Sequence, residues 1–85
     1  DIFWPSAPMI EVVRRAHDAG VRLVLASNTN PLHFAQVRRQ FAETIERFDA
    51  LVLSYEVGVR KPDRVFFRHC LDEARAPADA CVYVD

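Results

Sequence analysis

Three short apolar runs alternate with helix-like segments along this chain, and this alternation constrains the fold more than any other feature. The runs cover residues 21–26, 50–54 and 81–84. Runs of this length that are apolar almost throughout are typical of strands covered on both faces, as in parallel sheets. Strands that alternate with helices are joined by crossover connections and lie parallel. We therefore predict an α/β fold with three parallel strands.

The helices are predicted from the spacing of their apolar residues and from their ends. Ser6 is a candidate N-cap of the first helix, and Gly20 is placed to end it. Asn30 is a candidate cap of a second helix, which runs to about Gln40. A third helix begins near Asp63 and repeats the helical apolar spacing. The stretch between the second strand and this third helix is predicted to be a polar loop.

The composition excludes several classes of function. Lys and Arg together number 11 and Asp and Glu number 12, so the formal net charge is −1. No basic field favours a nucleic acid or an anionic membrane as a partner. No apolar run approaches the ~20 residues of a membrane span, and no segment resembles a signal peptide. Two cysteines are too few for a disulfide framework. We expect a soluble, cytoplasmic protein with no nucleic-acid or membrane partner.

Polar side chains follow each of the three predicted strands. Ser27 and Asn28 follow the first strand. Lys61 ends the loop after the second strand, and Asp85 follows the third. Ligands of open parallel sheets bind beyond the carboxyl ends of the strands. A hydroxyl beside the N–H groups of a helix start can bind an anion, and a carboxylate can hold a divalent cation. The pattern predicts a site for phosphate with Mg²⁺.

The order and spacing of these segments resemble the haloacid-dehalogenase-like (HAD) superfamily. The matching segments are Ser27-Asn28-Thr29-Asn30, Ser54-x-Glu56-x-Gly58-x-x-Lys61-Pro62-Asp63 and Val82-Tyr83-Val84-Asp85. The stretch through His33 looks most like the branch of small phosphatases with α-glucose-1-phosphatase-like members. The resemblance covers nearly the whole chain and implies a Rossmann-like core. Residues 1–85 would form part of that core domain, with the second motif, the third and the start of the fourth.

The resemblance also implies a role for each matching residue. Ser27 matches the second motif, whose hydroxyl hydrogen-bonds the transferring phosphoryl group beside the Asn28 amide. Lys61 matches the third motif, where the ammonium offsets negative charge on nucleophile and phosphate. Asp85 matches the first acid of the fourth motif, which binds Mg²⁺ directly or through water. These roles imply a Mg²⁺-dependent phosphatase that acts on a small phosphorylated metabolite through an aspartyl-phosphate intermediate.

One departure from the family concerns its first motif, an apolar strand that ends in Asp-x-Asp and supplies the nucleophile. The chain contains no such strand. We expect this chain to be a piece of a longer protein and to be inactive by itself, because covalent catalysis needs its nucleophile. In the family the missing strand lies between those that end at Ser27 and Asp85. We therefore expect the first two strands to pair, the third to face a gap or shift to close it, and the isolated chain to be poorly stable.

Two other functions fit the same residues. A 2-haloacid dehalogenase uses the same scaffold without Mg²⁺, and a degenerate domain would serve as a non-catalytic binding or interaction module. The histidines lie on three different predicted helices without the spacing of metal ligands, which favours surface or packing roles; they are His17, His33 and His69. Cys70 and Cys81 are interpreted as buried thiols rather than redox centres.

Overall fold

Two parallel strands lie at the centre of the computed structural model, which describes residues 5–83. The strands are β1 (Val24–Ser27) and β2 (Ala50–Leu53). Val24 lies opposite Ala50, and Ser27 lies opposite Leu53. Both strands therefore end at the same edge of the sheet, as predicted. The α/β class and the pairing of the first two strands are confirmed.

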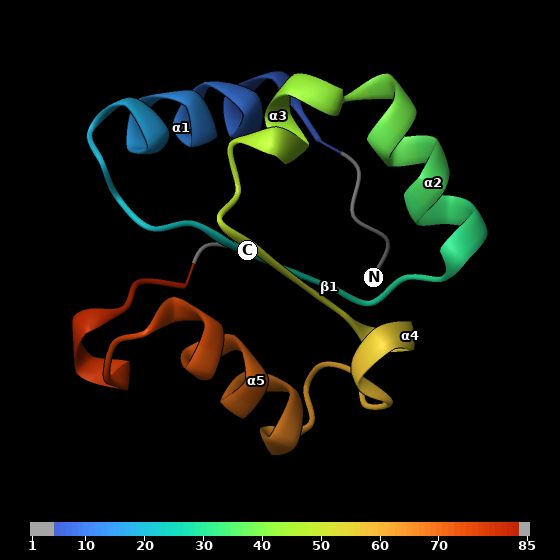
Figure 1. Ribbon diagram of the computed structural model, residues 1–85, viewed down its shortest axis with the longest axis vertical. Helices are drawn as coiled ribbons and strands as arrows, with labels where there is room; N and C mark the ends of the chain where they lie inside the picture. The colour runs from blue at the N-terminus through green and yellow to red at the C-terminus, as the bar shows by residue number, and fades with distance from the viewer. Residues whose placement is uncertain (1–4, 84–85) are drawn as a thin grey trace.

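Helices cover both sides of the strand pair (Figure 1). On one side lie α1 (Ala7–Asp18), α2 (Pro31–Gln40) and α3 (Ala42–Glu46). On the other side lie α4 (Ser54–Val57) and α5 (Arg64–Ala74), followed by the 3₁₀ turn η1 (Ala78–Ala80). The chain crosses between the two parallel strands through α2 and α3, because a parallel pair cannot be joined by a tight hairpin.

Each of the three long helices begins with a side-chain cap; those at Ser6 and Asn30 are the predicted caps, and the third helix begins near Asp63 as predicted. The Ser6 side chain accepts a hydrogen bond from the Met9 amide. Asn30 Oδ1 accepts from the His33 amide at 2.8 Å, and Asp63 Oδ1 accepts from the Val65 amide at 2.7 Å. These bonds satisfy backbone donors that have no partner inside the helix. Gly20 follows α1 with a φ of 79°, in the left-handed region that favours glycine.

The main apolar core lies between the strands and the helices α2 and α3. Its buried members come from β1, β2 and these two helices; they are Leu25, Phe34, Val37, Ile45 and Leu53. Because side chains alternate along a strand, Val52 faces the opposite side of the sheet, where α5 packs and its Phe66 is fully buried. Both faces of this short sheet are thus apolar, which explains the near-continuous apolar runs in the sequence.

The third predicted strand, residues 81–84, is not found in the described part of the chain. Cys81 has extended backbone angles, but Cys81–Tyr83 form no strand, and the two described strands are β1 and β2. Val82 is 88% exposed. An extended segment joins a sheet only where a neighbouring strand offers its backbone groups. The predicted neighbour is the first-motif strand, and the sequence has no apolar run that ends in Asp-x-Asp.

Two short helices were not predicted. Residues 42–46 form α3 where no element was expected, and α4 occupies the start of the predicted polar loop. α4 ends at Gly58, whose φ is 79° and whose amide donates to the Ser54 carbonyl at 3.0 Å. This single helical turn begins directly after Leu53, the last residue of β2. It therefore sets the direction in which the chain leaves the strand toward Lys61.

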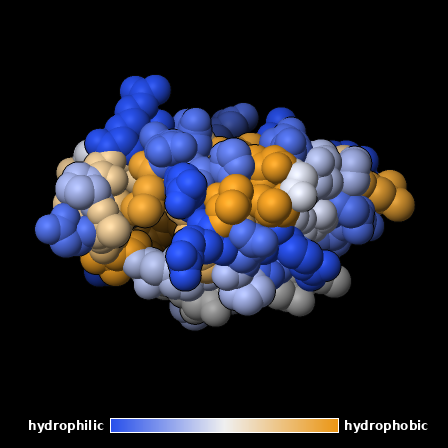
Figure 2. Space-filling model, turned by 90° about the horizontal axis from the view of Figure 1, so that it is seen from below, coloured by the Kyte–Doolittle hydropathy of each residue, from blue (hydrophilic) through white to orange (hydrophobic). Residues whose placement is uncertain are grey.

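The surface combines polar and apolar side chains. On the face seen in Figure 2, hydrophobic residues lie in separate groups between hydrophilic ones. The large apolar side chains with the greatest exposure are Leu32 and Val82. Among residues 5–83, no helix has the length and apolar character needed to cross a membrane.

Candidate functional site

Ser27 is the last residue of β1, at the edge where both strands end. Its side chain is 1% exposed. In the described part of the chain its Oγ is the one buried side-chain oxygen or nitrogen that has no hydrogen-bond partner. Burial of a hydroxyl without a partner costs about 1–3 kcal/mol. Such an atom calls for an explanation in a native fold, and a hydrogen bond to a bound ligand is one.

Asn28 joins the end of β1 to the loop that carries Lys61. Its Nδ2 donates to the Lys61 carbonyl oxygen at 3.1 Å. Its Oδ1 accepts from the Lys61 backbone N–H at 2.7 Å. The two residues are 33 positions apart in the sequence. The structure therefore brings the Lys61 backbone next to Asn28, the residue that follows Ser27.

A second link at this edge comes from Ser54, which sequence reasoning did not assign to the site. Ser54 Oγ accepts from the Thr29 amide at 2.9 Å and donates to the Thr29 carbonyl at 3.0 Å. Ser54 follows Leu53, the register partner of Ser27. The position of Ser54 in the sequence could have revealed this link. Ser54 directly follows β2, and a hydroxyl at the end of one parallel strand can reach the segment that follows the neighbouring strand.

The Lys61 side chain extends toward Tyr83 and α5. Its Nζ lies 3.4 Å from the Tyr83 hydroxyl oxygen and 6.0 Å from the centre of the Tyr83 ring. The ring of Phe67 meets that of Tyr83 edge to face, with 5.8 Å between their centres. On the same helix, burial raises the pKa of the Cys70 thiol, and the charge of Lys61 acts in the opposite direction. The ammonium thus lies close enough to α5 to affect groups there.

The predicted metal ligand, Asp85, lies outside the described residues. Within residues 5–83, no three side chains of His, Cys, Asp or Glu come together in a way that could hold a metal ion. The histidines come from α1, α2 and α5. Cys70 and Cys81 are free thiols, and both are partly exposed, whereas the sequence analysis interpreted them as buried. The described residues therefore supply the hydroxyl and the ammonium of the predicted site.

Comparison with known proteins identifies the class to which this α/β core and its strand-end residues belong. The chain is a member of the haloacid dehalogenase-like hydrolase family, whose sequence profile matches residues 3–85. The predicted family and its Rossmann-like core are confirmed.

One relative of known activity type is the sesquiterpene phosphatase astK of Aspergillus oryzae. The chain is 31% identical to it over 81 residues, which cover 95% of this chain and 41% of that protein. The chain therefore spans about two fifths of the length of this curated relative. No solved structure matches the chain.

Proposed function

We propose that this chain is part of a phosphatase that acts on a small phosphorylated metabolite. The observation that carries the proposal is the Ser27 hydroxyl, which is buried at the carboxyl end of β1 and has no partner among the described residues. A phosphoryl oxygen would supply the missing acceptor. The proposal is also supported by membership of a hydrolase family and by the similarity to a protein named as a phosphatase.

In this proposal Ser27 and Lys61 act on the negative charge of the phosphoryl group. The Ser27 hydroxyl donates a hydrogen bond to a phosphoryl oxygen, with the Asn28 backbone beside it. The Lys61 ammonium offsets the charge that the phosphoryl group and the nucleophile share. Groups placed in advance where charge develops lower the barrier without reorganising during the reaction.

The nucleophile is proposed to come from the same protein but not from these residues. The resemblance assigns it to an Asp-x-Asp segment, and the 85 residues contain no apolar strand that ends in that pattern. We therefore propose that this piece is inactive alone and that the complete protein reacts through an aspartyl-phosphate. In that arrangement residues 1–85 bind and orient the phosphoryl group and balance its charge.

The proposal includes Mg²⁺, and among residues 1–85 it assigns one ligand of this ion, Asp85. Residues 5–83 bring no three His, Cys, Asp or Glu side chains together as a metal site, and we propose that any further protein ligand lies outside them. When bound, a divalent cation would add positive charge beside the phosphoryl oxygens.

The substrate class is proposed from the named relative. The astK protein is named as a sesquiterpene phosphatase, so a phosphorylated terpenoid is one substrate to test beside phosphorylated sugars. The alternative chemistry of the same scaffold is hydrolysis of 2-haloacids, which releases halide instead of phosphate.

The test uses the complete protein that contains this chain. Release of inorganic phosphate is measured from a sesquiterpenyl phosphate and a sugar phosphate, and release of chloride from 2-chloropropionate. We expect phosphate release, and we expect Ser27→Ala to reduce kcat/KM by about 10²–10³-fold, as for loss of one donor to developing charge. Ser6→Ala, which removes a helix cap far along the chain from the site, is the matched control and should keep wild-type turnover.

Two results would contradict the proposal. Release of chloride without release of phosphate would assign the protein to the dehalogenases. Wild-type phosphate release by Ser27→Ala would show that the buried hydroxyl does not bind the phosphoryl group.

A further inference from the structure

We propose that Asn28 is a positioning residue, whose side chain holds the Lys61 backbone in place rather than binding the substrate. The inference rests on the proposed function, because it concerns how Lys61 is presented to a phosphoryl group. The family resemblance implies a different role for Asn28, in which the Asn28 amide lies beside the phosphate. The evidence is the hydrogen bonding of the Asn28 side chain.

The Asn28 side-chain amide forms two hydrogen bonds with Lys61, one as a donor and one as an acceptor. Nδ2 donates to the Lys61 carbonyl at 3.1 Å, and Oδ1 accepts from the Lys61 N–H at 2.7 Å. A side-chain amide carries donors on its nitrogen and an acceptor on its oxygen, so one Asn side chain can pair with both the N–H and the C=O of a single residue. Asn28 thus pairs with Lys61 much as one strand residue pairs with another, although the segment around Lys61 is a loop.

The burial of Asn28 gives this pair its strength. Only 7% of Asn28 is exposed, so water offers little replacement if either bond is lost. A buried polar group that loses its partner pays its full desolvation cost. The loop at Lys61 is therefore tied to the end of β1 by two bonds that are unfavourable to break.

Because of the location of Asn28, its bonds to Lys61 also position Lys61 relative to Ser27. Asn28 directly follows Ser27, which the β1–β2 pairing holds in register opposite Leu53. Because Asn28 fixes the Lys61 backbone, it sets the point from which the lysine side chain extends, relative to the Ser27 hydroxyl. A lysine ammonium sits on a flexible four-carbon stem, so a fixed backbone limits the volume it samples. Misplacement of a catalytic group by about 1 Å can cost up to about a hundredfold in rate.

The experiment measures hydrogen exchange of the Lys61 amide by NMR in the complete protein, with Asn28→Ala as the test variant. The Asp49 amide, which donates to the Leu23 carbonyl at 2.7 Å at the opposite end of the strands, is the internal reference for general opening. We expect the exchange rate of Lys61 relative to that of Asp49 to rise about tenfold, the effect of losing one buried hydrogen bond. Asn30→Asp is the matched control, because an Asp also caps α2, and the ratio should stay at its wild-type value.

Turnover supplies the second readout. We expect Asn28→Ala to lower kcat/KM by about tenfold to a hundredfold, partly through a higher KM, because a displaced ammonium also binds the phosphate less well. A variant that merely contained more unfolded protein would show a lower kcat at an unchanged KM. The exchange ratio is independent of the reaction, so it tests the Asn28–Lys61 link even if the protein proves not to be a phosphatase.

Either of two results would overturn the inference. An unchanged ratio of Lys61 to Asp49 exchange would show that Asn28 does not hold the loop. A raised ratio with wild-type kcat and KM would show that holding the loop has no catalytic consequence. If Asn28→Ala also speeds exchange at Asp49, the ratio remains decisive, and Asn28→Ser provides a second, smaller change for the same comparison.

Discussion

Lys61 Nζ lies 3.4 Å from the hydroxyl oxygen of Tyr83. Tyr83 belongs to the last apolar run, two residues before Asp85. The described part of that run forms no strand, yet its tyrosine contacts the lysine that follows β2. The ring of Tyr83 is in turn held edge to face by Phe67, which makes the same contact with the fully buried Phe66. The ammonium is thus connected to the α5 side of the core through three aromatic rings.

We predict that the ring of Tyr83 matters more for turnover than its hydroxyl. Tyr83→Phe keeps the ring near Lys61 and Phe67, whereas Tyr83→Leu removes it. A cation near an aromatic face at an exposed site is stabilised by about 0.5–1 kcal/mol. In the complete protein, Tyr83→Leu should therefore lower kcat/KM by about two- to fivefold, and Tyr83→Phe should stay close to wild type. Equal losses in both variants would assign the effect to the hydroxyl instead.

The turn after β2 makes Gly58 sensitive to substitution. Its φ of 79° lies in the left-handed region, and a Cβ built there meets no atom within 4 Å. The cost of Gly58→Ala is therefore one of backbone conformation, about 1–2 kcal/mol. Unfolding in urea should show this loss in the free energy of unfolding, with an unchanged m-value.

Asparagine is the comparison at this position, because it adopts the left-handed conformation more readily than alanine does. Gly58→Asn should retain a larger part of the wild-type stability. If alanine and asparagine destabilise equally, the backbone explanation for Gly58 is wrong.

The elements that were predicted correctly are those set by local sequence. Apolar runs and capping residues act locally, so the first two strands, the caps at Ser6 and Asn30 and the start of a helix near Asp63 were predicted from the sequence. α4 was missed because a single turn is too short to show helical periodicity. Its one signal is Gly58, four residues after Ser54, at the spacing that ends a helical turn. The third strand failed as a prediction because pairing depends on a neighbour, which local sequence does not reveal.

The same limit applies to the candidate site. Residue types and strand ends predicted that Ser27 and Lys61 would lie at one edge, and the Asn28–Lys61 bonds place both chain segments there. The links made by Asn28 and Ser54 depend on the register of β1 against β2. Register is a property of the folded pair, so the roles of these side chains became visible only in the structure.

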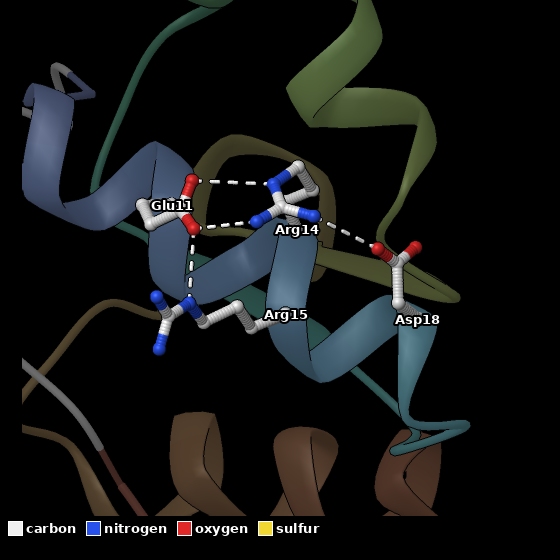
Figure 3. Close-up of polar contacts among 4 residues, drawn as sticks. All are labelled: Glu11, Arg14, Arg15 and Asp18. Atoms are coloured by element: carbon white, nitrogen blue, oxygen red, sulfur yellow. Dashed lines mark hydrogen bonds and ion pairs between the residues drawn. The ribbon is translucent and has the colours of Figure 1, made fainter.

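A network of charges on α1 connects one carboxylate to two arginines (Figure 3). Glu11 Oε1 accepts from Arg14 Nε at 3.2 Å, and Glu11 Oε2 accepts from Arg15 Nε at 2.9 Å. Arg14 also reaches Asp18, with 3.0 Å between the nitrogen and the carboxylate oxygen. The Arg14 hydrogen bond, followed by that of Arg15, lowers the pKa of Glu11 from 4.5 to about 2. The same contacts raise the pKa of Arg14.

The lowered pKa predicts how α1 responds to acid. A carboxylate with a lower pKa in the folded state adds stability that is fully present above its unfolded pKa of about 4.5. That stability is lost as the pH falls from there toward about 2. The difference in melting temperature between wild type and Glu11→Gln should therefore shrink between pH 5.5 and pH 2. Because the side chains are exposed, it should also shrink in high salt at pH 5.5. A difference that is the same at both pH values would show that the α1 charge network does not stabilise the fold.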